Sequence, residues 1–347
     1  MTDSDGLVSP RAGSCRLRPR AATVTPDPGW VLRAPAPETP VAPGPRPSFT
    51  VLVPAYQAAA HLPASVGSAL AQDEPAVQVL VVDDGSTDDV VAALRPFGAR
   101  VELVRSPHVG LPAVRNLGLQ HARGDFVAFL DADDVLEPGF LAGLATLSAA
   151  RPDLDILTTD ARFVVDGVPA GTFYEANGFP VEDQRAAVLE RCFLTTKTAV
   201  RTRRLHEVGG FDPALLHGED WECWIRLVLT GSRAGLVDAP LSQYHLHGGQ
   251  LSARRGPSLR GRYDVMAGLL ARPDLTGPER AAVAARLPAL RLRAAVATAR
   301  EASGTAARAA WWQVARTPGA SPRLRLGAVA RAVLPARPAA TRRPRDA

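Results

Sequence analysis

The feature that most constrains this fold is a set of three short apolar runs, each followed at once by polar residues. Short β-branched and aromatic runs that end in breaker or polar residues are typical of strands buried on both faces of a sheet. The runs and their polar ends are residues 49–53 with Pro54-Ala55-Tyr56, residues 77–82 with Asp83-Asp84, and residues 126–130 with Asp131-Ala132-Asp133-Asp134.

Segments with helical periodicity separate these runs. We expect helices over 62–71, 87–95, 110–122 and 138–150, and further strands over 101–105 and 156–159. Strands that alternate with helices predict βαβ units, and hence a Rossmann-like α/β fold with a mainly parallel sheet and helices on both faces. Ligands of such sheets bind beyond the carboxyl ends of the strands, so we expect the polar ends of the three runs to form the site.

The pattern is looser after residue 160. We expect a hairpin over 162–173 that turns at Asp166-Gly167, an extended stretch over 236–244, and helices over 185–191 and 221–230. From residue 277 onward the chain is rich in alanine, arginine and leucine. This part is predicted to be helical, with breaks at its prolines.

Proline and charge divide the chain into three regions. Residues 1–47 contain ten prolines and are predicted to be a mostly disordered leader, because dense proline blocks both helix and sheet hydrogen bonding. Residues 48–255 are predicted to be the α/β domain. Residues 256–347 hold 17 arginines against five acidic residues, although the whole chain has a formal charge of only +5. A basic, helical C-terminal region therefore follows a net acidic body.

Composition excludes several classes of protein. With 347 residues, 46% of them hydrophobic, the chain is large and apolar enough to bury a core. Its three cysteines are too few and too far apart for a disulfide scaffold or a structural zinc site, and they suit a reducing compartment. No apolar run approaches the roughly 20 residues of a membrane-spanning helix, and the N-terminus lacks a secretory signal. We therefore expect a cytoplasmic location.

The acidic run Asp131-Ala132-Asp133-Asp134 is the strongest candidate for chemistry. Three carboxylates within four residues repel one another unless a cation joins them. Carboxylate oxygens suit Mg²⁺ or Mn²⁺, which usually bind substrate phosphates as well. A lone Asp at this position would more often begin a helix, because negative charge is favourable at a helix N-terminus. Three acids at the end of a strand favour the cation site.

Two other acidic pairs each allow a structural and a functional interpretation. Asp83-Asp84 is either part of a plain Asp-Gly turn or a site for the base N–H or ribose hydroxyls of a nucleoside. Its adjacent aspartates do not match the DxDGT spacing of a phosphatase nucleophile loop. Glu219-Asp220 is either an acid pair that complements the dipole of the helix it begins, or the source of a general base.

Single basic side chains near these acids are equally open to two interpretations. Arg115 is expected on a helix near the carboxyl edge of the sheet, where it either pairs with phosphate or lies on a solvated helix face. His245 and His247 follow the extended stretch. They are either surface histidines or ligands that help the aspartates to hold a metal.

Taken together and in order, these motifs make residues 49–255 resemble the family 2 glycosyltransferases, which have the GT-A fold. The resemblance covers about three-fifths of the chain, and each motif is weak alone. The matching segments are Thr50–Tyr56, Val81–Asp88, Ala113–Gly118, Ala122–Phe126, Phe129–Asp134, Gly209–Asp212 and Gly218–Glu222.

The resemblance implies a role for each candidate residue. Asp133 would bind a Mg²⁺ or Mn²⁺ ion that bridges the diphosphate. His247 falls where relatives often carry the histidine of a Tyr-Arg-x-His run, and here that run is Tyr244-His245-Leu246-His247, with the Arg replaced. Asp220 would be the catalytic base, beside Glu219, and Trp221 would help to shape the acceptor side. The implied nucleotide-binding residues are Pro54, Ala55, Tyr56, Asp83, Asp84, Arg115 and Asp131.

The implied activity is an inverting transfer of one sugar from a nucleotide-diphospho-sugar to a glycan, lipid-linked or small-molecule acceptor, as in cell-envelope or other glycan biosynthesis. No QxxRW-type motif follows Asp220, which favours single transfer over processive synthesis. A sugar-nucleotide pyrophosphorylase is one alternative, but it would need a Gly-rich loop with Arg and Lys where this chain has residues 56–60. An inactive nucleotide-binding protein is the other, but none of the expected acids is lost.

The basic C-terminal region carries its arginines together with Trp311 and Trp312. An amphipathic basic helix with tryptophan suits an anionic surface, so peripheral contact with the inner face of the cell membrane is one expectation. The other is a solvated helix that packs its leucine and alanine face on the catalytic domain. Nucleic acid is not an expected partner, because no binding motif accompanies the charge.

Overall fold

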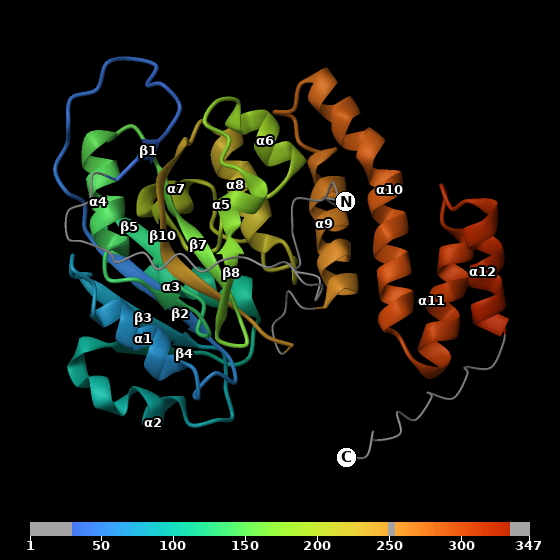
Figure 1. The fold of residues 1–347 in the computed structure, drawn as a ribbon, viewed down its shortest axis with the longest axis horizontal. Coiled ribbons are helices and arrows are strands. Elements are labelled where there is room, and N and C mark those ends of the chain that lie inside the picture. The colour runs from blue at the N-terminus through green and yellow to red at the C-terminus, as the bar shows by residue number, and fades with distance from the viewer. Residues whose placement is uncertain (1–29, 249–253, 334–347) are drawn as a thin grey trace. The chain divides into compact units, whose positions relative to one another are not determined.

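The computed structural model describes residues 30–248 and 254–333, which belong to two compact units. Figure 1 shows a unit built around a sheet, coloured blue to yellow, and a helical unit in orange and red. The other parts of the predicted leader and C-terminal region, residues 1–29 and 334–347, lie outside the described residues, as does the link at 249–253.

A ten-stranded mixed sheet forms the centre of the first unit. Its strand order is β1-β10-β7-β9-β5-β2-β3-β4, with β6 paired to β10 and β8 paired to β7. The strands are β1 Leu32–Arg33, β2 Phe49–Ala55, β3 Gln78–Asp83, β4 Glu102–Arg105, β5 Phe126–Phe129, β6 Val135–Leu136, β7 Ile156–Val165, β8 Val168–Thr172, β9 Thr198–Arg201 and β10 Ala234–Leu246.

Four neighbouring strands have the predicted parallel arrangement. β2 pairs in parallel with β3 and β5, and β3 pairs in parallel with β4. Every residue of β2, β3 and β5 is buried, as expected of a strand covered on both faces. Because these strands run in the same direction, Ala55, Asp83 and Phe129 end at one edge of the sheet. The α/β prediction is confirmed, and so is the hairpin, which turns at Asp166-Gly167.

Helices cover both faces of this sheet (Figure 1). Val51 and Val53 of β2 pack with Leu62 of α1 and Leu144 of α4 on one face, while on the other Phe129 meets Phe211 with ring centroids 5.4 Å apart. The helices of this unit are α1 Leu62–Leu70, α2 Val90–Leu94, α3 Leu111–His121, α4 Phe140–Ala150, α5 Phe173–Asn177, α6 Gln184–Glu190, α7 Thr202–Glu207 and α8 Glu219–Leu229.

A strand that the sequence analysis missed lies in the middle of the sheet. β9 pairs antiparallel with both β5 and β7, with Val200 opposite Val127 and Ile156. It has four residues and little alternation, so its own pattern carries a weak signal. Its position matters because the loop before it brings Lys197 to the end of β5.

Part of the predicted leader is ordered. β1 pairs antiparallel with β10, and the Arg33 Nε donates to Asp238 at 2.7 Å. Further along, the Gly44 N–H donates to the Ala149 carbonyl at 2.8 Å. Within the leader that was predicted to be mostly disordered, Leu32–Arg33 thus form a strand, because an extended proline-rich chain can still pair at the edge of a sheet.

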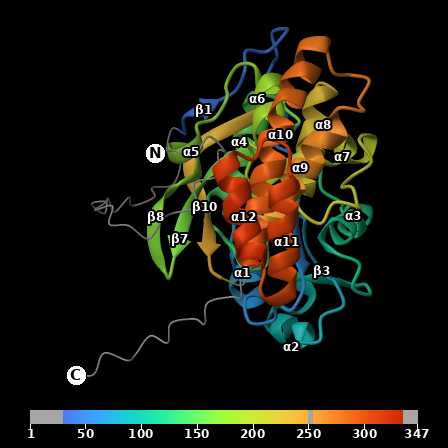
Figure 2. The ribbon, with the colours of Figure 1, turned by 90° about the vertical axis from the view of Figure 1, so that its right-hand side faces the viewer.

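The second unit is helical. Its helices are α9 Arg255–Leu269, α10 Gly277–Glu301, α11 Gly304–Arg316 and α12 Pro322–Val333. α10 continues through Pro288, where a break was expected, whereas α12 begins at a proline as predicted. Figures 1 and 2 both show α11 and α12 side by side, and Val314 and Ala328 are buried between them. None of the described helices combines the length and apolar character that crossing a membrane needs.

Candidate active site

The nucleotide-binding prediction begins at the end of β2. Pro54 and Ala55 are buried within the strand, so they can meet a ligand through little more than their backbone, and the Ala55 carbonyl already accepts the Asp84 N–H at 2.8 Å. Tyr56 is 49% exposed, and its ring stacks on His108 with centroids 4.1 Å apart and planes 19° apart. A flat, exposed aromatic pair at a strand end is suited to stacking on a nucleobase.

Asp83 and Asp84 hold the loops that follow β3 and β4. Asp83 accepts a hydrogen bond from the Arg105 Nε at 2.9 Å, and Asp84 accepts from the N–H groups of Val109 and Gly110 at 2.7 and 3.0 Å. Both aspartates are buried. Both aspartates therefore have a structural role in holding these loops. A nucleoside would have to bind the acceptor sites of their carboxylates that remain.

The turn from Asp131 to Asp134 is neutralised from inside the protein. Lys197, the single lysine of the chain, is 1% exposed and forms ion pairs with Asp134 and with Asp131, the latter at 3.4 Å. Its ammonium also lies 4.0 Å from the centroid of the Tyr244 ring. Burial alone would lower the pKa of Lys197, but the two carboxylates raise it above its ordinary value, so the side chain stays charged. The Lys197 ammonium thus supplies part of the positive charge that the neighbouring carboxylates of this turn require.

Arg115 joins this turn to the acid pair at the start of α8. Its guanidinium lies 3.3 Å from Asp131 and 2.6 Å from Glu219. The side chain is 3% exposed and lies over the ring of Phe211, 5.3 Å from its centroid. Burial would lower the pKa of Arg115, but Glu219 and Asp131 raise it. The structure therefore excludes a solvated helix face and makes Arg115 an internal bridge between carboxylates.

The two acids at the start of α8 differ in exposure. Glu219 is buried against Arg115, whereas Asp220 is partly exposed and accepts the Trp221 N–H at 2.7 Å. Burial raises the pKa of Asp220, while Arg115 lowers it. Burial likewise raises the pKa of Glu219, to about 7, against the opposing effect of Arg115. A carboxylate with a raised pKa accepts a proton more readily, which suits Asp220 to the work of a general base.

Trp221 lies behind the acid pair. Its side chain is 3% exposed, and its Nε1 donates to the Val188 carbonyl at 2.8 Å, which ties α8 to α6. Trp221 can therefore shape an acceptor site only through the placement of α8, not by contact with the acceptor.

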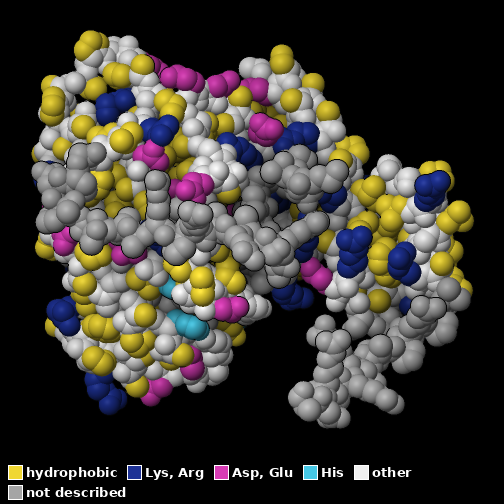
Figure 3. All heavy atoms as spheres, in the orientation of Figure 1, with side chains coloured by type: hydrophobic (Ala, Val, Ile, Leu, Met, Phe, Trp, Pro, Cys, Tyr) yellow, Lys and Arg dark blue, Asp and Glu magenta, His cyan; other side chains and the backbone are white. Residues whose placement is uncertain are grey.

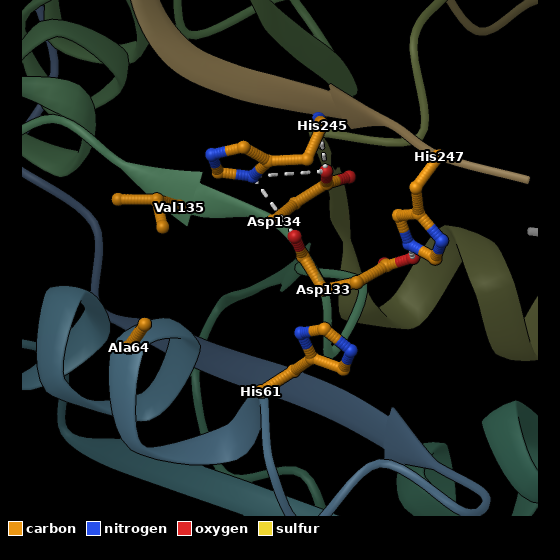
Figure 4. Close-up of a pocket in the computed structure, with 7 residues that line it drawn as sticks. All are labelled: His61, Ala64, Asp133, Asp134, Val135, His245 and His247. Carbon is orange, nitrogen blue, oxygen red and sulfur yellow. Dashed lines mark hydrogen bonds and ion pairs between the residues drawn. The ribbon is translucent and has the colours of Figure 1, made fainter. Parts of the chain in front are cut away.

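A pocket of about 290 Å³ opens beside Asp133 (Figure 4). Asp133 Oδ2 lies 2.9 Å from His247 Nε2, and the His247 ring stacks on that of His61 with centroids 5.7 Å apart. His245 Nδ1 lies 2.9 Å from the Asp133 carbonyl oxygen. In the space-filling view of Figure 3, histidine atoms gather in a hollow of the same unit. The pocket is lined by His61, Ala64, Asp133, Asp134, Val135, His245 and His247.

Asp133 and His247 fit a divalent cation that is shared with a substrate. Carboxylate and imidazole are both ligands for such ions, and here they converge at a partly exposed position. Within residues 30–248 and 254–333, no group of three or more histidine, cysteine or acidic side chains is arranged to hold a metal alone. A small protein donor set suits Mg²⁺ or Mn²⁺, which takes its other ligands from phosphate and water.

Sequence reasoning missed several side chains of this site. Thr196 donates its hydroxyl to Asp131 at 2.8 Å, beside Lys197. His61 and His108 each stack on a predicted site residue. The only signal for Lys197 was that it is the one lysine in a chain rich in arginine. His61 and His108 stand in loops whose folded positions no local pattern indicates.

Most of the motifs that carried the resemblance lie in a range that matches a family model. Residues 50–209 match the family model described as Glycosyl transferase family 2. The comparison thus places this range, somewhat under half of the chain, with glycosyl transferase family 2. The matched range includes Asp84, Arg115 and Asp133, but it ends before α8.

Two curated relatives show the scale of the similarity. An uncharacterized glycosyltransferase of Rickettsia conorii is 27% identical over 208 residues, which cover 58% of this chain and 33% of the relative. WfgD of Escherichia coli, named as a UDP-Glc:alpha-D-GlcNAc-diphosphoundecaprenol beta-1,3-glucosyltransferase, is 24% identical over 230 residues, which cover 65% of this chain and 87% of the relative. The chain thus spans a third of the first relative and most of the second.

Solved structures of other proteins show the same GT-A fold. S. aureus TarS in complex with UDP-GlcNAc matches with a TM-score of 0.56 and 19% identity, over 80% of this chain and 82% of that one. The mannosyltransferase PcManGT from Pyrobaculum calidifontis, in complex with GDP-Man and Mn²⁺, matches with a TM-score of 0.55 and 22% identity, over 85% and 88% of the two chains. The predicted GT-A fold is therefore confirmed.

Proposed function

We propose that this protein transfers one sugar from a nucleotide-diphospho-sugar to an acceptor hydroxyl, with inversion and with the help of a divalent cation. One observation carries the proposal. The buried guanidinium of Arg115 bridges Asp131, in the turn that would hold the cation, to Glu219, next to the proposed base Asp220. Residues far apart in the sequence thus meet in one centre, with a carboxylate partly exposed on each side of it.

The donor would lie along the carboxyl edge of β2, β3 and β5. Tyr56 and His108 would stack on the nucleobase, and the buried Asp84 would hold the loop beneath it. TarS and PcManGT, each solved with a nucleotide sugar, support this class of donor. Asp133 and His247 would hold the cation, and PcManGT was solved with Mn²⁺. When bound, a divalent cation supplies positive charge that stabilises the leaving diphosphate.

Asp220 would act on the acceptor. It takes the proton of the acceptor hydroxyl, and the oxygen forms a bond to the anomeric carbon from the side opposite the nucleotide. The bond between that carbon and the diphosphate oxygen breaks, and the diphosphate leaves with the electron pair. One such displacement inverts the configuration of the carbon. Arg115 and Glu219 hold the start of α8, so that Asp220 is placed before the acceptor arrives.

The deciding experiment measures the release of nucleoside diphosphate from a panel of UDP- and GDP-sugars, with and without Mn²⁺. Calorimetry with nucleoside di- and triphosphates accompanies it. We expect Mn²⁺-dependent binding of a nucleoside diphosphate. We also expect nucleoside diphosphate to be cleaved from the donor when its sugar is transferred to an acceptor or to water. A preference for triphosphate, with pyrophosphate and a nucleotide-diphospho-sugar as the products once a sugar 1-phosphate is added, would instead establish the pyrophosphorylase alternative. Nucleotide binding with no turnover of any donor would support an inactive binding protein.

The second unit supports a lipid-linked acceptor. Its surface carries arginines, shown dark blue in Figure 3, and Trp312 and Leu326 are 39% and 73% exposed. Exposed arginine beside exposed apolar side chains suits an anionic membrane surface. WfgD is named for an undecaprenol-linked acceptor, which supports the same assignment. The exposed arginines of α10, α11 and α12 are Arg291, Arg300, Arg308, Arg316, Arg323, Arg325 and Arg331.

Vesicle binding tests this part of the proposal. The full chain should sediment with vesicles that contain phosphatidylglycerol and should stay in solution with pure phosphatidylcholine, and added salt should weaken the binding. The double variant Arg323→Glu/Arg325→Glu should bind the anionic vesicles less well and release nucleoside diphosphate from the donor unchanged. Sedimentation with neither kind of vesicle would contradict membrane contact, and equal sedimentation with both would contradict recognition of an anionic surface.

A further inference from the structure

Lys197 is a buried cation to which the proposed reaction gives no part. It stands one residue before β9, and its side chain is 1% exposed. Its partner Asp134 is fully buried, and the Tyr244 ring covers its ammonium. Removing a charge from water costs free energy unless the charge is paired, so a buried lysine at this position calls for an explanation.

Lys197 is one member of a buried chain of alternating charges. It pairs with Asp134 and Asp131, Asp131 pairs with Arg115, and Arg115 pairs with Glu219. The chain therefore runs from the turn after β5 to the start of α8. Asp133 stands between the two aspartates that Lys197 holds.

The partners of Asp134 connect Lys197 to both proposed ligands of the cation. Asp134 is the direct neighbour of Asp133, and its Oδ1 accepts the His245 N–H at 2.8 Å. His245 lies on β10, and His247 directly follows the end of that strand. Figure 4 shows Asp134 directed toward His245, while the side chain of Asp133 is directed toward His247. One ion pair therefore fixes the turn that carries Asp133 and the strand end that carries His247.

We propose that Lys197 is a positioning residue of the active site, which holds Asp134 and Asp131 so that Asp133 and His247 converge on a divalent cation. The inference rests on the proposed function, since it assumes a cation at Asp133. A positioning role and a purely electrostatic role of Lys197 predict opposite changes in metal affinity when the lysine is removed. A cation close to a metal site repels the metal, so its removal without structural change would tighten metal binding. Loss of positioning would weaken it.

The test uses the full chain and Mn²⁺, titrated with UDP or GDP present and followed by electron paramagnetic resonance of free Mn²⁺. Lys197→Met should weaken Mn²⁺ binding by tenfold or more and should lower the midpoint of thermal unfolding. Lys197→Met/Asp134→Asn removes one buried charge of each sign. It should recover part of the thermal stability, because no carboxylate is left without its lysine, while Mn²⁺ binding stays weak.

Arg201→Met is the matched control. Arg201 is the last residue of β9, pairs with Asp155 at 2.9 Å and lies 4.6 Å from the centroid of the Phe126 ring. It therefore shares with Lys197 a carboxylate and an aromatic partner, at the other end of the same strand, and its side chain is 20% exposed. Its loss should lower thermal stability and leave Mn²⁺ binding unchanged.

The outcomes are distinct. If Lys197→Met binds Mn²⁺ as tightly as the wild type, or more tightly, Lys197 has no positioning role. If the double variant regains Mn²⁺ binding together with stability, Lys197 only neutralises Asp134, and the inference fails while the proposed function stands. If the wild type binds Mn²⁺ with neither nucleotide, the metal-assisted function is itself overturned, and this inference with it.

Discussion

The acids after β3 and the acids after β5 stand at the same edge of one sheet, yet the protein neutralises them in different ways. Asp84 is held by main-chain N–H groups, and Asp83 pairs with Arg105, whose side chain is 57% exposed. Asp131 and Asp134 are held by Arg115 and Lys197, which are almost fully buried.

The acids after β3 are thus held mainly by groups on neighbouring loops, whereas the acids after β5 depend on residues far away in the sequence. Main-chain N–H groups hold Asp84, and the side chains that pair with Asp83 and Asp84, Arg105 and His108, are each 57% exposed, so changes to these two partners should be tolerated. At the β5 end each carboxylate relies on a cation brought from elsewhere in the chain. Removing one partner of a buried ion pair leaves an uncompensated charge, which is far more damaging than the loss of an exposed pair.

The largest effect is expected at the far end of the β5 network. Asp220→Asn removes the proposed base, and kcat should fall by roughly 10²–10⁴-fold, the usual contribution of general base catalysis. The dissociation constant of the nucleoside diphosphate, measured by calorimetry, should change by no more than severalfold. A large loss of nucleotide affinity would instead assign Asp220 to donor binding and not to the acceptor side of the site.

A direct comparison of the two strand ends comes from their arginines. Arg115→Met leaves Asp131 and Glu219 buried without their shared cation, and the free energy of unfolding should fall by about 3–5 kcal/mol. Arg105→Met should cost less, because its side chain is 57% exposed and Asp83 keeps the Ser86 N–H as a donor. Urea denaturation at neutral pH measures both, and equal losses would refute the contrast between the two regions.

Nucleotide affinity sharpens the comparison from the β3 side. Tyr56→Ala removes the exposed ring that would stack on the nucleobase, so UDP or GDP binding should weaken by about 1–3 kcal/mol while kcat changes little. Trp312→Ala is the control, since Trp312 is an exposed aromatic side chain of the second unit. If the nucleotide affinity of Tyr56→Ala is unchanged, the nucleobase does not stack on Tyr56.

The smallest expected effect is a displacement of the pH profile. Burial raises the pKa of Asp220 above its ordinary value, and the base must be ionised to act. The rate should therefore rise with pH through this raised pKa, and it should be lost on acidification earlier than an ordinary aspartate would predict. A profile of kcat/KM in the wild type measures the acid limb. A limb at the pKa of a solvent-exposed aspartate would show that burial does not govern the base.

Much of the fold and of the candidate site could be predicted from local sequence. The apolar runs at β2, β3 and β5 and the helices α1, α3 and α4 lie where periodicity placed them, because buried strands and amphipathic helices leave a strong local pattern. The acids at the strand ends followed from the direction of parallel strands. The four-residue β9 and the two-residue β1 did not, since segments so short depend on pairing with residues far along the chain.

The sequence by itself determined the α/β class, the edge of the sheet where the polar residues gather, and the candidate acids, because these depend on hydrophobic period and strand direction. Only the tertiary structure decided which cation meets which acid. Arg115 and Lys197 lie outside the acidic motifs, and nothing in their neighbours shows that they are buried between them. Electrostatic pairing is decided by distance in space, and long-range strand pairing, here through β9, sets that distance.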